Sequence, residues 1–202
     1  MKTASYTITG LSPLLCHNGQ AIDPLNHYAK EMKRVSKKKN KTDEDQVIIS
    51  KVEWFMSIYH DGKPDTLKDG AIAIDPAARL VLPANAIEAM IVAGSKKLKQ
   101  GNLAKAGLIV DEDAHLIHDG PKNITELYET GRYTHRVAAR VGTARVMRTR
   151  PIFRVWSSTI TVMHDESVID EQDIFTIIKT AGQQCGIGDW RPRFGRFEAE
   201  RA

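Results

Sequence analysis

The chain has 202 residues, of which 42% are hydrophobic and 27% charged, and its formal net charge is +4 at pH 7. This size suits two small domains or, as we expect, one compact domain with a large insertion, and the hydrophobic content is enough for a substantial core. No apolar run approaches the roughly 18 residues of a membrane-spanning helix, so we expect no membrane role. Two cysteines, Cys16 and Cys185, and the lack of an apolar leader after Lys2 predict a cytoplasmic location.

A pair of helices is expected early in the chain. The first begins at Pro24, with Asp23 as its N-cap. Thr42 followed by Asp45 is a capping-box pattern that begins the second helix. The lysine-rich run between them is typical of a solvated loop. Residues 20–60 are therefore predicted to form a helical insertion.

The remaining elements follow the order strand, helix, two strands, helix, strand. Apolar and polar residues alternate in segments 2–10 and 151–163, and Pro83 and Asp170 open the two helices. The expected segments are 2–10, 84–99, 108–117, 151–163, 170–184 and 194–198. This is the order of the ferredoxin-like or RNA-recognition (RRM-like) arrangement, a four-stranded antiparallel sheet with two helices on one face. The sequence therefore predicts a single α+β domain, whose palm comprises residues 1–19, 71–130 and 151–202.

A long stretch without acidic residues lies in the second half of the chain. From Thr130 to His164 there is no Asp or Glu, but there are seven arginines and no lysine. Arginine is preferred to lysine where phosphates are bound bidentately or bases are stacked. Residues 131–150 are predicted to form a thumb-like hairpin about Gly142, and its candidate nucleic-acid contacts are Arg136, Arg140, Arg145, Arg148 and Arg150. The alternative is a solvated edge ribbon.

A second cationic segment follows the last expected helix. Residues 182–197 interleave four glycines with three arginines and three aromatic residues. Glycine lets main-chain N–H groups approach phosphates, arginine supplies charge, and an aromatic ring stacks on a base. The candidate contacts are Gly186, Gly188, Trp190, Arg191, Arg193 and Arg196. The alternative is a tight helix-to-strand connection whose aromatic residues fill the core.

Three segments resemble one family. The run from Leu80 to Ile91 resembles the strand–Pro–helix signature of the RAMP superfamily, specifically the backbone subunits of CRISPR effector complexes. Residues 186–197 are similar to the carboxy-terminal glycine-rich loop of that superfamily, and residues 10–14 fit the end of its first strand. The resemblance also fits a minimal member of the superfamily from a phage or a mobile element. It implies a hairpin thumb that reaches over a neighbouring subunit, a helical or filament-like homo-oligomer, and other effector subunits as further partners.

The resemblance also implies sequence-independent binding of single-stranded nucleic acid, with RNA favoured and single-stranded DNA as the other substrate. Repeated subunits would bind cooperatively, and the affinity would fall with salt. Phosphates are expected over the glycine-rich loop and at the amino end of the first palm helix, where Asn85 and main-chain N–H groups would hold one. No catalytic residue, metal or cofactor is expected for this function.

Two other classes of function are left open. A metal-independent RNA-processing endonuclease of the same superfamily would use His17, just after the first strand, as a general acid or base, assisted by Tyr28 or Lys30. A structural or assembly protein would bind no nucleic acid. The first class predicts RNA cleavage that is lost in His17→Ala, and the second predicts purified protein that carries no nucleic acid.

Overall fold

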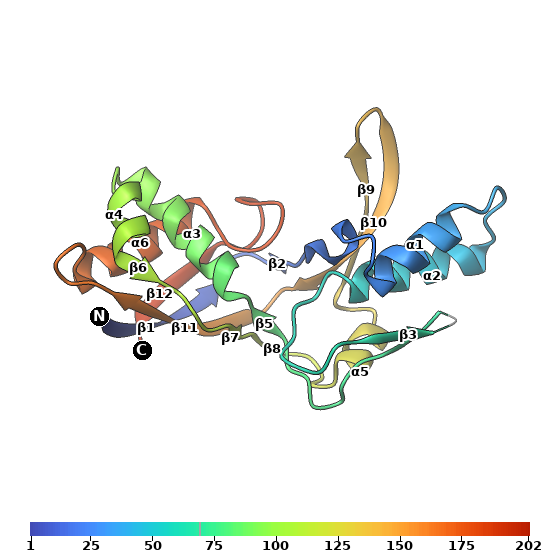
Figure 1. Cartoon of the computed structure of the whole chain (residues 1–202), viewed down its shortest axis with the longest axis horizontal. Coiled ribbons are helices and arrows are strands. Elements are labelled where there is room, and N and C mark those ends of the chain that lie inside the picture. The colour runs from blue at the N-terminus through green and yellow to red at the C-terminus, as the bar shows by residue number, and fades with distance from the viewer. Residues whose placement is uncertain (69) are drawn as a thin grey trace. The chain divides into compact units, whose positions relative to one another are not determined.

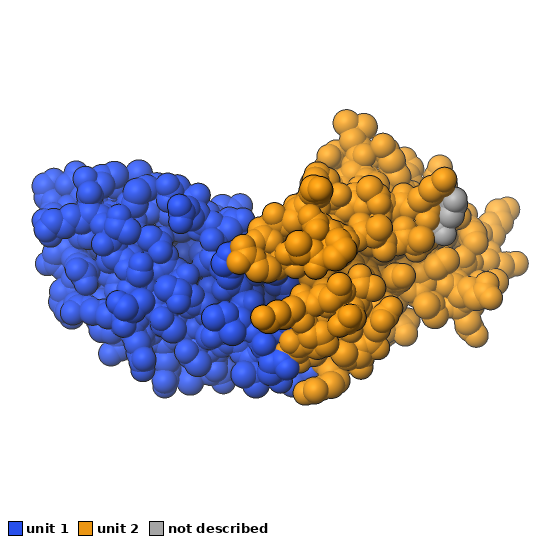
Figure 2. Space-filling view, turned by 90° about the horizontal axis from the view of Figure 1, so that it is seen from below, with its two compact units in different colours: residues 1–15, 80–119, 153–202 blue, residues 16–79, 120–152 orange. Residues whose placement is uncertain are grey.

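The computed structural model describes residues 1–68 and 70–202, and the chain forms two compact units (Figure 1, Figure 2). Unit 1 comprises residues 1–15, 80–119 and 153–202, and unit 2 comprises residues 16–79 and 120–152. The expected helical insertion and the expected hairpin thus belong to the same unit. Both units mix helices with antiparallel strands, so the predicted α+β class is confirmed. None of the described helices has the length and apolar character needed to cross a membrane.

The sheet of unit 1 is centred on two long antiparallel strands. Its members are β1 (Lys2–Gly10), β6 (Leu108–Ile109), β8 (Ile117–His118), β11 (Trp156–His164) and β12 (Phe197–Arg201). β1 pairs antiparallel with β11 on one side and with β12 on the other, and the order across the sheet is β12-β1-β11-β6. β8 also pairs with β11. The predicted alternation in β1 is confirmed, because Ala4, Tyr6 and Ile8 are buried.

Helices lie on one side of this sheet (Figure 1). They are α3 (Ala84–Lys97), α4 (Gly101–Gly107) and α6 (Glu171–Gln184). α3 and α6 pack closely, since a Cβ on Gly94 would lie 2.6 Å from the Cβ of Ala181. α6 begins as predicted, with Asp170 accepting a hydrogen bond from the Asp173 N–H at 2.7 Å. Unit 1 also contains β2 (Leu14–Leu15) and the strand pair β5 (Val81–Leu82) and β7 (Ala114–His115).

Unit 2 is built around an aromatic core. Its elements are a 3-10 turn (Gly19–Ile22), α1 (His27–Ser36), α2 (Asp43–Phe55), β3 (Thr66–Lys68), β4 (Ala71–Ala73), α5 (Ile124–Glu129), β9 (Thr134–Val141) and β10 (Ala144–Phe153), the last residue of which lies in unit 1. The buried indole of Trp54 packs edge-on against Phe55 and Tyr128. Its N–H donates to the carbonyl of Tyr133 at 2.9 Å, which ties α2 to the segment before β9.

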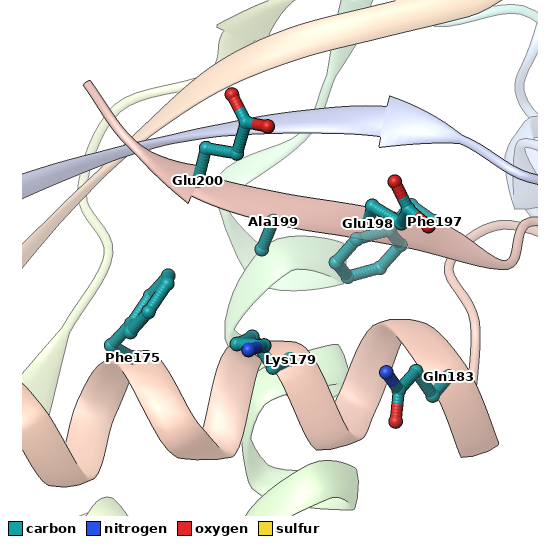
Figure 3. Close-up of a pocket in the computed structure, with 7 residues that line it drawn as sticks. All are labelled: Phe175, Lys179, Gln183, Phe197, Glu198, Ala199 and Glu200. Carbon is teal, nitrogen blue, oxygen red and sulfur yellow. The ribbon is translucent and has the colours of Figure 1, made fainter.

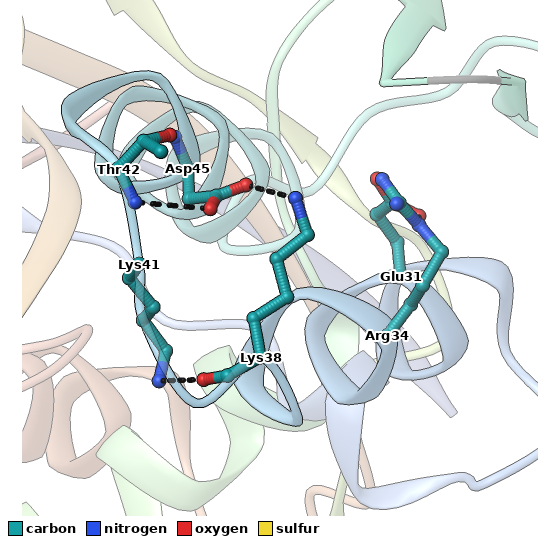
Figure 4. A network of polar contacts seen from close by, with 6 residues as sticks. All are labelled: Glu31, Arg34, Lys38, Lys41, Thr42 and Asp45. Carbon is teal, nitrogen blue, oxygen red and sulfur yellow. Dashed lines mark hydrogen bonds and ion pairs between the residues drawn. The ribbon is translucent and has the colours of Figure 1, made fainter.

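The connection between α1 and α2 is fixed by a polar network (Figure 4). The capping box is confirmed, because Thr42 and Asp45 exchange main-chain and side-chain hydrogen bonds at 3.1 and 3.2 Å. Lys38 donates to Asp45 at 2.6 Å, and this contact holds the pKa of the Asp45 carboxyl below its usual range. A bidentate pair between Arg34 and Glu31 lies alongside. At least this part of the lysine-rich loop is therefore held by specific contacts.

The first helix begins later than predicted. α1 starts at His27, and its N-cap is Asn26, whose side chain accepts a hydrogen bond from the Tyr28 N–H at 2.8 Å. Asp23 instead accepts from the Leu25 N–H in a separate turn. The prediction failed because both Asp and Asn suit a cap, and pattern alone does not choose between two such residues three positions apart.

Three predicted strands also differ from the observed strands in their bounds. The expected strand 151–163 is divided at residues 154–155, where β10 ends and β11 begins. The last strand begins at Phe197 and not at Phe194, because the Phe194 N–H bonds back to the Trp190 carbonyl within a turn. The expected strand 108–117 is divided into shorter strands, of which β6 and β8 both pair with β11.

Candidate nucleic-acid interface

The hairpin of β9 and β10 turns at Gly142 as predicted, and Figure 1 shows it extending away from α1 and α2. Its register pairs Arg140 with Arg145, Ala138 with Met147, and Arg136 with Thr149. Directly opposed side chains of an antiparallel pair lie on the same face. Arg136, Arg140 and Arg145 therefore share one face, which we call the arginine face, with the apolar Ala138–Met147 pair between its cationic ends.

All three side chains of the arginine face are exposed. Arg140 donates from Nε to the Gly142 carbonyl at 3.1 Å, which orients its guanidinium at the turn. Across residues 1–68 and 70–202, no carboxylate pairs with Arg136, Arg140 or Arg145. Like charges directly opposed across two strands are destabilising. The Arg140–Arg145 pair is thus unfavourable in the isolated protein and becomes favourable when an anion lies beside it.

Arg148 differs from these three arginines, because it is anchored to an acidic residue of α2. Its Nη1 lies 2.6 Å from Oε1 of Glu53, whose side chain is 3% exposed. The other carboxylate oxygen of Glu53 accepts the Thr149 N–H at 2.8 Å. Glu53 was not singled out from the sequence, although an acid between Val52 and Trp54 on the apolar side of a helix indicates a buried partner.

A cavity of about 270 Å³ adjoins this anchor, and we call it the basal cavity. It is lined by His17, Ala21, Glu53, Met56, Ser57, Arg148, Thr149 and Arg150, all of which belong to unit 2. Arg148 and Arg150 are two positions apart in β10 and so leave the strand on the same side. The structure therefore brings His17, the candidate general acid or base, together with two of the five hairpin arginines.

The glycines of the carboxy-terminal loop serve close packing of the main chain. Gly186, Gly188 and Gly195 all have positive φ, and a Cβ on Gly195 would overlap the main chain of Ile187. The Gly186 N–H donates to the Ala181 carbonyl, and the Gly195 N–H donates to the Pro13 carbonyl, both at 2.8 Å. These N–H groups are committed within the protein. The observations favour the tight-connection interpretation for Gly186, which is buried, over a phosphate contact.

The side chains of the same loop form an exposed cationic and aromatic surface. Trp190 is 48% exposed, and the guanidinium of Arg193 lies 5.8 Å from the centre of its ring. Arg191 and Arg196 are exposed beside them, and Arg196 donates from Nε to the Pro192 carbonyl at 3.0 Å. Phe194 and Phe197, in contrast, are buried. The loop thus combines one exposed aromatic ring with three guanidinium groups, and we call these four residues the loop surface.

The amino end of α3 does not offer the expected phosphate site. The Ala84 N–H donates to the carboxylate of Asp113 at 2.8 Å, so an acidic side chain already occupies this helix terminus. A phosphate there would have to displace that carboxylate or be repelled by it. Asn85 is exposed at this end of the helix, but the neighbouring negative charge does not support a role for it in binding phosphate.

Tyr28, one of the two residues expected to assist His17, takes part in a different network. It is buried, and its hydroxyl donates to Asp65 at 2.6 Å. The other oxygen of Asp65 lies 3.0 Å from Nε2 of His60. Burial and the bond to Asp65 raise the pKa of the Tyr28 hydroxyl, and the bond to Asp65 raises the pKa of His60. Tyr28 is therefore a structural residue, and Lys30 stays exposed on α1.

A second cavity, of about 420 Å³, lies in unit 1 between α6 and the edge strand β12 (Figure 3). Phe197 and Ala199 point from the strand toward the helix, while Glu200 points away from it (Figure 3). Phe175, Lys179 and Gln183 line the helical side. The cavity carries two acidic side chains, Glu198 and Glu200, and one lysine, so it does not suit an anionic ligand.

The expected nucleic-acid contacts thus fall into two sets, one in each unit. The hairpin arginines and the basal cavity belong to unit 2, and the loop surface belongs to unit 1. No protein-family model and no curated protein matches this chain.

Proposed function

We propose that the protein binds single-stranded nucleic acid without sequence specificity, RNA in preference to DNA, through the arginine face of its hairpin. The observation that carries this proposal is the opposed pair of Arg140 and Arg145, which lacks a carboxylate partner within the described residues. A protein gains little by opposing two arginines on an exposed ribbon unless an anion binds there. A phosphodiester strand supplies that anion repeatedly along its length.

The loop surface supports the same function from unit 1. A half-exposed indole with a guanidinium beside it suits a nucleobase, because every base has a stacking face and every nucleotide has a phosphate. Neither this surface nor the arginine face depends on a particular pattern of base-edge donors and acceptors. Binding is therefore proposed to be independent of sequence.

Unit 1 is proposed to be a ferredoxin-like palm of the RAMP type. The order β12-β1-β11-β6, the antiparallel pairing of β1 with both neighbours, and the packing of α3 on α6 support this assignment. In this account the hairpin is the thumb, and repeated subunits associate along the strand. Multimerisation is tested by light scattering with and without a long single strand, which is expected to raise the mass in steps of one subunit.

The binding function is tested by the salt dependence of affinity. Each phosphate neutralised on a single strand contributes about 0.7 to the slope of log K against log salt. Arg140→Ala combined with Arg145→Ala is expected to make the slope shallower by about 1.4. The matched control is Lys33→Ala with Lys63→Ala, which removes the same charge from exposed sites of unit 2 outside the hairpin. Equal slopes for the two double variants would contradict the proposal.

The endonuclease is the second candidate, because the basal cavity brings His17 close to Arg148 and Arg150. Such an arrangement offers a general acid or base beside cations that stabilise a charged phosphorus centre. The test is to incubate labelled RNA with wild type and His17→Ala in the presence of a metal chelator. Products that form with wild type and disappear with the variant would make the protein an enzyme. An intact substrate supports binding alone.

A further inference from the structure

The sheet of unit 1 has an acidic edge. Its edge strand is β12, which pairs with β1 and with no other strand in the part of the chain that the structure describes. Glu198 and Glu200 of β12 are exposed, and none of the ion pairs formed within the ranges 1–68 and 70–202 includes either of them. An edge strand presents unpaired main-chain N–H and C=O groups, to which a further strand can bind. We call the outer side of β12 the acidic edge.

The cavity between α6 and β12 runs along this edge (Figure 3). On the strand side it is lined by four consecutive residues, 197–200. Consecutive side chains of a strand point to opposite faces, so a cavity that meets four in a row lies beside the strand and not over one face. Its volume of about 420 Å³ has room for the side chains of an added strand.

The hairpin of unit 2 has a basic edge. β9 is the outer strand in the order β2-β10-β9. Arg136, Ala138 and Arg140 lie on one face of β9, and Val137 and Ala139, which are half-buried, lie on the other. Like β12, β9 therefore has its charged residues on one face and small apolar residues on the other. We call the outer side of β9 the basic edge.

The charges of each edge disfavour pairing with an identical edge. When two β12 strands pair with their faces matched, carboxylates of one lie opposite carboxylates of the other, and two β9 strands bring arginines together in the same way. Like charges directly opposed across two strands are destabilising, whereas opposite charges stabilise the pair. The charges therefore favour a pair of one acidic edge with one basic edge.

We infer that the basic edge of one subunit pairs antiparallel with the acidic edge of a second copy, so that two sheets become continuous. Antiparallel pairing is the more stable per residue. This inference rests on the multimerisation included in the proposed function, and it names the two surfaces that meet. Because these surfaces differ, the contact is head-to-tail and repeats along an open filament unless the rotation between subunits closes a ring.

One register satisfies the charges on the exposed face. Glu200 lies opposite Arg136, and Glu198 lies diagonally from both Arg136 and Arg140. Diagonal neighbours are within reach of long side chains such as arginine. Arg136 thus makes the main charge contact between subunits, while the Arg140–Arg145 pair nearer the turn stays beside the nucleic-acid strand.

The same register satisfies the other face. Ala139 lies opposite Phe197, and Val137 lies opposite Ala199, whose side chains point toward α6 in Figure 3. The small apolar side chains of the added strand therefore enter the cavity between α6 and β12. Their burial there adds to the stability of the pair.

The test is sedimentation velocity of nucleic-acid-free protein over a concentration series. Wild type is expected to grow beyond two subunits as the concentration rises. Glu198→Lys with Glu200→Lys is expected to weaken association at least about tenfold, because opposite charges across the contact become like charges. The matched control, Glu88→Lys with Glu112→Lys, makes the same charge change at exposed sites of unit 1 outside β12 and should associate as wild type does. Circular dichroism confirms that each variant is folded.

Mixing two variants shows whether two different edges meet. Arg136→Gln with Arg140→Gln keeps the acidic edge, and Glu198→Lys with Glu200→Lys keeps the basic edge. The mixture is expected to form particles of two subunits and none larger. The inference is overturned if the mixture stays monomeric, if wild type stays monomeric throughout, or if the Glu198→Lys, Glu200→Lys variant associates as the control does.

Binding of a short oligouridine that holds one subunit separates this inference from the proposed function. The Glu198→Lys, Glu200→Lys variant should bind it as tightly as the matched control, since the acidic edge lies outside the arginine face. Tight binding by a wild type that never associates overturns the inference and leaves nucleic-acid binding standing. If wild type associates but binds no oligouridine, nucleic-acid binding fails and the contact between the two edges stands.

Discussion

Glu53 is predicted to be the residue on which the attachment of the hairpin to α2 most depends. In Glu53→Ala the Thr149 N–H, which is buried, loses its acceptor, at a cost of about 1–3 kcal/mol. The ion pair with Arg148 adds little, about 0–1 kcal/mol, because the arginine side chain is 37% exposed and regains water. The expected loss in the free energy of unfolding is therefore about 1–4 kcal/mol. Glu53→Gln retains an acceptor oxygen and is expected to lose about 1 kcal/mol.

Urea unfolding followed by circular dichroism measures these losses, and hydrogen exchange locates them. Protection should fall in peptides from β10 and α2 but not in peptides from α6, which belongs to unit 1. Adding Arg148→Ala to Glu53→Ala should cost less than about 1 kcal/mol more, since the guanidinium is already solvated. A Glu53→Ala variant that loses less free energy than Glu53→Gln would refute this reasoning.

Three further predictions concern local structure. Gly195→Ala should lower the free energy of unfolding by at least about 2 kcal/mol, because φ is positive and a Cβ would overlap a neighbouring carbonyl. Gly142→Ala, at similar φ in open space, should lower it by only about 1–2 kcal/mol. Equal losses for the two variants in urea unfolding would contradict the role assigned to packing at Gly195. The pair with Asp65 raises the pKa of His60, so the stabilising contribution of this pair is full below pH 6.5, the ordinary pKa of histidine, and is lost as pH rises through the raised pKa. His60→Gln should remove this part of the pH dependence of the free energy of unfolding. Parallel pH profiles for wild type and variant would contradict the prediction. Thr42→Ala should lower the free energy of unfolding by about 1 kcal/mol through loss of the capping box, and an unchanged urea midpoint would count against the cap.

The sequence predicted those elements whose signals are local. The alternation of β1, the capping box at Thr42, the cap at Asp170 and the hairpin turn at Gly142 each depend on residues within a few positions of one another. The stability of these elements depends on residues that are neighbours along the chain, so the sequence pattern was sufficient to predict them. The starting point of α1 was missed because two capping residues competed within the same few positions.

What the sequence did not predict depends on contacts between distant residues. Glu53 and Arg148 are 95 positions apart, and Ala84 and Asp113 are 29 apart. The first contact turns an expected nucleic-acid arginine into an anchor, and the second puts a carboxylate at an expected phosphate site. The same limit applies to the glycine-rich loop, where Gly188 was expected beside phosphate, but a Cβ on it would lie 2.6 Å from the main-chain oxygen of Leu15. The sequence showed which charged groups and main-chain N–H groups were present, but not which of them already bind other parts of the protein.

The most direct test of the central claim is photo-crosslinking of RNA that contains 4-thiouridine, followed by mass spectrometry of the cross-linked peptides. We expect cross-links within residues 134–150, on the hairpin, and at the loop surface around Trp190, both reduced in Arg140→Ala with Arg145→Ala. Bound RNA whose cross-links map only to the lysine-rich segment 37–41, or to α3 and α4, would contradict the claim that the arginine face holds the strand.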